Sequence, residues 1–191
     1  MATRGMSKAE LNQQMALALK KAVDYTVEQI QEENWHKVME IVYDAYFPSD
    51  YDRTYEFADK AWVTESNSRV EPNGASSSGA LKYDGSKLSS HRDDGFGQHM
   101  GFDDQECRMY LAEIIYEGMA GDFTQSSATG TPHYARDNPV FQNQAWAKKR
   151  NAWEALNKWL TPAQLKRIFN EGLTKAGLTY KSGAAIKKVV K

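Results

Sequence analysis

The chain has 191 residues, of which 41% are hydrophobic and 26% are charged, and its formal net charge is -1. This length suits one globular domain with extensions, and the near-neutral charge argues against a dedicated nucleic-acid-binding protein, which usually carries a strong basic excess. The single cysteine, Cys107, excludes an intrachain disulfide and a cysteine-rich zinc site, and it suits a protein made in a reducing cytoplasm. No apolar run is long enough to span a membrane, and the N-terminus lacks the apolar core of a signal peptide.

The N-terminal part of the chain, residues 1–47, predicts one long helix that begins near Lys8. Ser7 and Glu10 have the spacing of a capping box. About 38 residues at roughly 1.5 Å each would reach on the order of 57 Å, whereas a compact domain of this size has a radius of gyration of roughly 16 Å. Such a helix either projects and buries its apolar stripe on a second copy of the chain, or breaks near Glu32 and folds back. The residues expected in the subunit interface are Leu11, Met15, Leu19, Val23, Val27, Ile30 and Trp35.

The stretch that follows breaks the helix and gathers aromatic residues around one arginine. Pro48 cannot continue a helix. Tyr51, Tyr55 and Trp62 surround Arg53 in the sequence, and its planar cation can stack on rings or bind a carboxylate. An aromatic-rich hinge of this kind can also be part of an ordinary core.

The middle of the chain combines one strand, a long loop and one helix. Residues 61–70 partly alternate and begin with aromatic and β-branched residues, which predicts a strand. Turn signals are closely spaced over residues 71–106, so we expect a long loop with at most a short strand at Leu81–Tyr83. The histidines and carboxylates of this loop lack the spacing of known metal sites, so we expect neither metal nor cofactor. Residues 106–118 fit a helix or a strand, and the spacing of their apolar residues favours a helix that ends at Gly118.

Two amphipathic helices are expected in the C-terminal part and complete a compact core over residues 48–177. The first begins at Asn138–Pro139, and its tryptophans have a spacing that is more typical of a core than of a ligand cage. The second has Thr161 as N-cap and ends at Gly177. The remaining tail, residues 178–191, is either a solubilising end or a segment that contacts DNA phosphates without reading sequence. Its lysines are Lys181, Lys187, Lys188 and Lys191.

A short pattern follows the long helix: a proline, a Tyr-x-Arg-Thr group, an apolar residue and a tryptophan that opens a strand. Its residues are Pro48, Tyr51, Arg53, Thr54, Phe57 and Trp62. The pattern resembles a motif of small neck or tail-completion proteins of tailed bacteriophages, although this chain has Tyr55 where relatives commonly have glycine. The resemblance implies an α+β fold, in which a small antiparallel sheet is flanked by the long N-terminal helix and the C-terminal helices.

The sequence contains no pattern that would indicate an enzyme, such as a glycine-rich phosphate loop, a nucleophile elbow or suitably spaced paired carboxylates. We therefore expect a structural protein. The resemblance implies a virion subunit, assembled in the host bacterial cytoplasm, that forms a homo-oligomeric ring joining the head connector to the tail around the DNA channel. Its partners would be further copies, the neighbouring connector and tail proteins, and DNA in the channel, with no membrane. The alternatives are a head-closure, tail-terminator or minor capsid component, or a small metal- or nucleic-acid-binding module.

Overall fold

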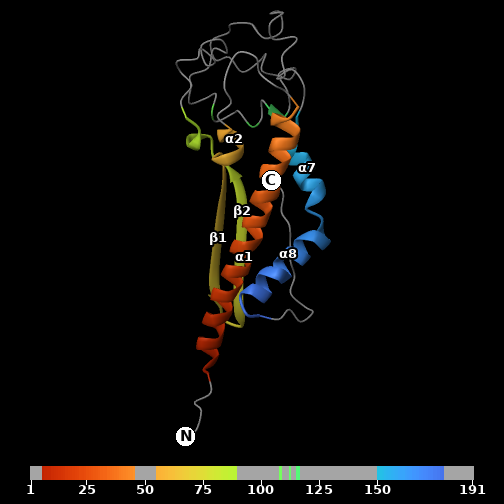
Figure 1. Ribbon diagram of the computed structural model, residues 1–191. Helices are drawn as coiled ribbons and strands as arrows, with labels where there is room; N and C mark the ends of the chain where they lie inside the picture. The colour runs from red at the N-terminus through yellow and green to blue at the C-terminus, as the bar shows by residue number, and fades with distance from the viewer. Residues whose placement is uncertain are drawn as a thin grey trace, which may run out of the picture. The chain divides into compact units, whose positions relative to one another are not determined.

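The computed structural model describes residues 6–45, 55–89, 108, 112, 115–116 and 150–178. It has the α+β class expected from the sequence, with a long N-terminal helix, a two-stranded antiparallel sheet and C-terminal helices (Figure 1). The helices and strands are, in chain order, α1 (Lys8–Val38), a π-helical segment (Met39–Tyr43), α2 (Glu56–Asp59), β1 (Trp62–Glu71), β2 (Gly74–Tyr83), a 3₁₀ turn (Gly85–Lys87), α7 (Ala152–Trp159) and α8 (Pro162–Lys175).

The chain divides into two compact units. The first unit comprises residues 1–32, 64–82 and 158–191, and the second comprises residues 33–63 and 83–157. Most of α1, most of the β1–β2 hairpin and α8 therefore belong to the first unit, while α2 and most of α7 belong to the second. No helix in the described ranges has the length and apolar character needed to cross a membrane.

Helix α1 begins with the capping box that the sequence predicts. The Ser7 N–H donates to Glu10 Oε2 at 2.7 Å, and the Glu10 N–H donates to Ser7 Oγ at 3.2 Å. The predicted alternative of a break near Glu32 is wrong, because the helix continues to Val38 and passes into the π-helical segment. The 31 residues of α1 span about 47 Å at 1.5 Å per residue.

The hairpin confirms one predicted strand and corrects the loop prediction. Strand β1 covers the residues expected to be extended, but β2 occupies ten residues of the stretch that the sequence assigns to a long loop. Pro72 and Asn73 alone connect the two strands. At the other end of the hairpin, Ala61 O accepts a hydrogen bond from the Asp84 N–H at 2.7 Å. The two strands therefore keep the register that the two-residue turn sets along their whole length.

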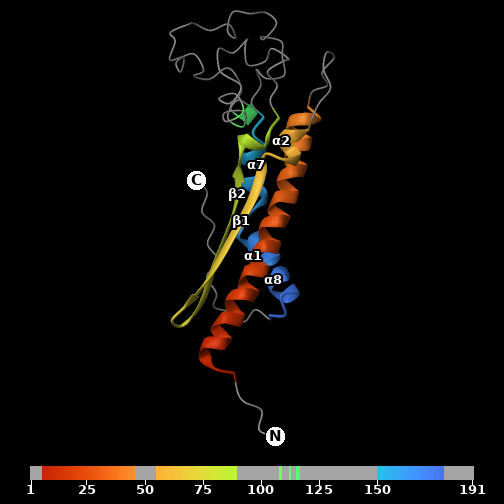
Figure 2. The ribbon, with the colours of Figure 1, turned by 90° about the vertical axis from the view of Figure 1, so that its left-hand side faces the viewer.

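Helix α1 packs closely on strand β2 at Gly79. An added Cβ at Gly79 would lie 2.6 Å from Cγ1 of Val23 and 2.6 Å from Cγ1 of Val27. The hairpin runs along α1 with its turn near the start of that helix (Figure 2). There, Lys8 Nζ donates to Asn73 Oδ1 at 3.2 Å, and the two elements are held side by side.

Helix α8 has both ends where the sequence places them. Thr161 Oγ1 accepts from the Gln164 N–H at 3.2 Å, and Gly177 adopts a left-handed φ of 80° after the last turn. α8 also approaches α1 closely, because an added Cβ at Gly172 would lie only 2.7 Å from the carbonyl oxygen of Ala22.

Aromatic rings form the core of the second unit. The Trp62 ring stacks between Trp153, at 5.5 Å and 12°, and Tyr116, at 6.1 Å and 19°. Phe57 and Tyr83 pack against the same indole, at centroid distances of 5.9 and 5.5 Å. Burial raises the pKa of both tyrosine hydroxyls above their ordinary value.

The described residues of the predicted 106–118 helix are helical, which favours the helix over the strand alternative. The predicted helix start at Asn138–Pro139 lies outside the described residues. α7 covers only the C-terminal part of that predicted helix, and the prediction of one continuous helix is wrong because Arg150 and Asn151 are not helical. Asn151 Oδ1 accepts from the Glu154 N–H at 2.7 Å and caps a helix that begins at Ala152. The residues that carry the 106–118 assignment are Arg108, Ala112, Ile115 and Tyr116.

Candidate assembly surface

The seven residues expected at a subunit interface divide between the core and the surface of α1. Val23 and Val27 are buried against β2 and are not available to a second chain while the hairpin is in place. Leu11 is 49% exposed and Trp35 is 36% exposed, and the Trp35 indole N–H donates to Asp59 Oδ1 at 2.7 Å. The half-buried members are Met15, Leu19 and Ile30.

Other predicted site residues lie outside the part of the chain that the structure describes. Of the Pro48–Trp62 pattern, Phe57 is buried in α2 and Trp62 opens β1. The residues outside the described ranges are Pro48, Tyr51, Arg53 and Thr54 of the motif and Lys181, Lys187, Lys188 and Lys191 of the tail.

Tyr55, the motif position that is commonly glycine in the resembling family, has an unusual backbone. Its φ is 57°, the left-handed conformation that glycine adopts without cost and that side chains with a Cβ disfavour. The Tyr55 ring lies 4.8 Å from the Tyr43 ring at 34°, so an aromatic contact helps to hold the residue in place.

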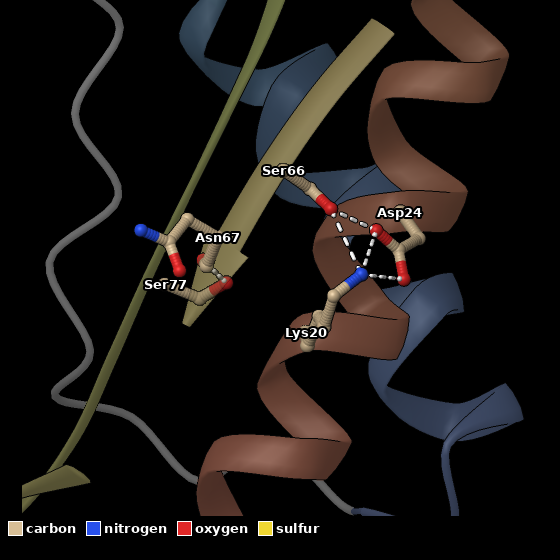
Figure 3. Close-up of polar contacts among 5 residues, drawn as sticks. All are labelled: Lys20, Asp24, Ser66, Asn67 and Ser77. Atoms are coloured by element: carbon tan, nitrogen blue, oxygen red, sulfur yellow. Dashed lines mark hydrogen bonds and ion pairs between the residues drawn. The ribbon is translucent and has the colours of Figure 1, made fainter. Parts of the chain in front are cut away.

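A polar cluster joins α1 to β1 in the first unit (Figure 3). Lys20 Nζ donates to both carboxylate oxygens of Asp24, at 2.9 and 3.0 Å, and to Ser66 Oγ at 3.1 Å. The Ser66 hydroxyl donates to Asp24 Oδ1. This hydrogen bond lowers the pKa of Asp24 below its ordinary value, and the Lys20 ammonium lowers it further.

The cluster contains a serine, a lysine and an aspartate, but its geometry does not suit nucleophilic catalysis. An activated serine needs a neighbouring base that can take its proton. Here the lysine is ion-paired to both carboxylate oxygens, and the aspartate oxygen that accepts from Ser66 is bound by the same lysine. We therefore interpret the cluster as a clamp between helix and strand, stabilising by up to about 1 kcal/mol because Lys20 and Asp24 are 44% and 35% exposed.

The sequence alone does not predict this clamp. The spacing of Lys20 and Asp24 is a usual i, i+4 ion pair. No sequence pattern predicts that Ser66 contacts this pair, because tertiary packing determines which residues of β1 lie beside which residues of α1.

The face of the hairpin that points away from α1 carries opposite charges. Lys82 forms an ion pair with Glu65 across the two strands. Arg69 Nε donates to Glu71 Oε1 at 2.6 Å and to Ser76 Oγ at 3.3 Å. The Glu65 and Arg69 side chains remain 58% and 78% exposed, so they are accessible to a partner.

Among the described residues of the second unit, one carboxylate is buried, that of Glu56. Glu56 accepts from Lys60 Nζ at 2.5 Å, from Ser89 Oγ at 2.6 Å and from the Ser89 N–H at 2.7 Å. These donors, Lys60 first, lower the pKa of Glu56 to about 2. A carboxylate with this many donors is a structural tie between α2 and the segment after the 3₁₀ turn.

No three histidine, cysteine, aspartate or glutamate side chains gather as metal ligands within the described ranges. The histidines and carboxylates of the predicted 91–106 loop are outside those ranges. Comparison with protein-family models, curated proteins and solved structures finds no match for this chain.

Proposed function

We propose that this chain is a structural subunit of a tailed-bacteriophage virion, a neck or tail-completion protein that assembles with further copies into a ring between the head connector and the tail. The resemblance of the Pro48–Trp62 pattern supplies the identity in this proposal. The chemistry of assembly comes from α1 and from the apolar side chains that it leaves exposed.

The observation that carries the assembly part of the proposal is the uncovered apolar surface in the first half of α1. Leu11 and Leu17 are 49% and 57% exposed, and Met6, just before the helix, is 54% exposed. Complete burial of a fully exposed apolar side chain contributes about 1.5–3 kcal/mol, so each of these half-exposed side chains contributes about half of that when association covers it. A subunit that meets several neighbours could bury all three.

Tyr55 supports the resemblance independently of the sequence pattern. The left-handed φ at this position explains why glycine would be common there in related chains. This chain keeps the same type of backbone conformation with a tyrosine, at a cost of order 1–3 kcal/mol that the contact with Tyr43 offsets in part.

Native mass spectrometry of the full chain tests the proposal. A ring gives one discrete high stoichiometry, and Leu11→Asp should lower it because a charge replaces an apolar contact. Ser78→Asp is the matched control, since Ser78 is exposed on the face of the hairpin that points away from α1, and the same added charge there should leave the assembly intact. A full chain that remains monomeric or dimeric at all concentrations would contradict the ring.

Removing residues 1–30 cannot separate assembly from folding, because Val23 and Val27 belong to the core of the first unit. Point variants on the exposed side of α1 avoid this difficulty.

The lysine tail supplies the proposed contact with DNA in the channel. Deleting residues 179–191 should abolish weak, strongly salt-dependent DNA binding, because phosphate contacts release counterions. Binding that survives the deletion would favour a nucleic-acid-binding module instead.

A further inference from the structure

The outer edge of β1 has no strand beside it in the part of the chain that the structure describes. The sheet has two strands, with β2 on one side of β1. An unpaired edge presents a row of backbone N–H and C=O groups that can pair with another strand. Strand β1 is ten residues long, so this edge is extensive.

The hairpin register decides which residues of β1 point their backbone groups outward. The Asp84–Ala61 hydrogen bond and the two-residue connection fix the same alternation. Backbone groups of Glu65, Asn67 and Arg69 therefore point toward β2, and those of the residues between them point to the outer edge. The residues whose backbone N–H and C=O groups point to the outer edge are Thr64, Ser66, Ser68 and Val70.

We infer that the outer edge of β1 pairs antiparallel with β1 of a second copy, about a two-fold axis at Asn67. This register joins Ser66 to Ser68 of the other copy through backbone hydrogen bonds and places the two Asn67 side chains opposite each other. It also places Glu65 opposite Arg69 of the other copy, twice by symmetry. The resulting sheet has the strand order β2, β1, β1, β2.

Charge complementarity selects this register over its neighbours. Moving the axis to Ser68 would place Glu65 opposite Glu71, which is unfavourable. Moving it to Ser66 would place Arg69 opposite Val63 and Glu65 opposite Asn67, with no ion pair. Of these three registers, only the axis at Asn67 pairs both Glu65 and Arg69 with a charge of opposite sign, and it places Glu71 opposite Val63.

The helices fit the same arrangement. The two-fold axis is perpendicular to the sheet, so both α1 helices lie on one face of it. Each helix packs on a hairpin roughly 9–10 Å wide, because neighbouring strands are about 4.8 Å apart, and this matches the usual 8–10 Å between packed helices. Leu17 precedes Lys20 by three residues and Asp24 by seven, so it lies on the side of α1 that faces β1 and would be covered by the second helix.

This dimer goes beyond the proposed function and does not depend on it. A two-fold contact closes on itself, whereas ring neighbours make head-to-tail contacts. The β1 pair is therefore a separate contact from those that would close a ring.

Reversal of the two charges tests the register. Glu65→Arg and Arg69→Glu each place like charges opposite each other twice, and each should raise the dimer dissociation constant roughly tenfold or more. The double variant restores opposite charges and should return to within about threefold of the unmodified chain. Analytical ultracentrifugation measures the constants, and circular dichroism confirms that each variant is folded. Single variants without effect, or a double variant as weak as the singles, would overturn the register.

A cysteine at the two-fold axis gives a second readout. In a Cys107→Ser background, Asn67→Cys should form an intermolecular disulfide in high yield on mild oxidation. The two Asn67 residues form a non-hydrogen-bonded pair, in which directly opposed residues have Cβ atoms about 4.5–5.5 Å apart. Ser78→Cys is the matched control, since it lies on the same face of the hairpin but one strand away from the axis. Equal crosslinking of both variants, or none of Asn67→Cys, would refute the pairing.

The two hypotheses fail separately. A chain that forms a ring but shows neither charge rescue nor the Asn67→Cys crosslink contradicts the dimer alone. A dimer that never gives a larger assembly contradicts the ring alone.

Discussion

Gly172 is the position at which the packing of α8 on α1 can be tested most directly. An added Cβ would lie 2.7 Å from Ala22 O, 3.0 Å from Ala22 Cα and 3.1 Å from Tyr25 Cδ1. Two of these three atoms belong to the backbone of a helix, so relief requires the helices to separate. We therefore expect Gly172→Ala to destabilise the protein.

The size of the effect follows from two opposing terms. Alanine in a helix interior is favoured over glycine by about 1 kcal/mol. Overpacking typically costs about 1–3 kcal/mol, and a contact with backbone belongs to the upper end of that range. The net loss should be about 1–2 kcal/mol, or a fall in Tm of about 2–8 °C for a chain of this length.

Chemical denaturation of the full chain measures the change in the free energy of unfolding. The matched control compares Lys21→Ala with Lys21→Gly at an exposed position within α1, where only helix propensity acts. If Gly172→Ala were stabilising by the difference that the Lys21 pair shows, the close approach of α8 and α1 would be refuted.

Three further predictions concern the second unit. Because the pKa of Glu56 falls from 4.5 to about 2 on folding, its contribution is present above pH 4.5 and is lost as the pH falls through 2. Glu56→Gln should cost about 1–2 kcal/mol at pH 7 in urea titrations, and the difference from the unmodified chain should shrink steadily as the pH is lowered from 4.5 toward 2. Asn34 is fully buried with no hydrogen-bond partner for its amide among the described residues, so Asn34→Leu should raise the free energy of unfolding by about 1–2 kcal/mol, and a loss of stability would show that the amide is satisfied. Tyr55→Gly should be about 1 kcal/mol more stable than Tyr55→Ala in thermal unfolding, because both lose the contact with Tyr43 and only glycine relieves the left-handed backbone; the opposite order would contradict the strain.

Local signals predicted the start of α1 and both ends of α8. Ser7 and Glu10 cap α1, and Thr161 and Gly177 bound α8, because capping depends on residues within a few positions of one another. The start of β1 at Trp62 also follows from local composition.

Tertiary packing decided what the sequence did not predict. The small residues of β2 read as loop, yet Gly79 is small because Val23 and Val27 lie against it. The same contact buries two residues that were expected in a subunit interface. Glu65 and Arg69 are ordinary surface residues in the sequence. Only the hairpin register shows that both lie on the face of β1 that points away from α1, beside the outer edge.

Helix α1 belongs to both units, since its residues up to Glu32 pack in the first and the following residues in the second. One uninterrupted ladder of amide hydrogen bonds therefore passes through both folded regions. Melting the first region would leave residues 8–32 as a long segment of isolated helix, which is marginally stable in water, whereas only residues 33–38 of α1 pack in the second. We therefore expect loss of the first region to weaken the second through the shared helix, and amide hydrogen exchange should then become faster on both sides of Glu32.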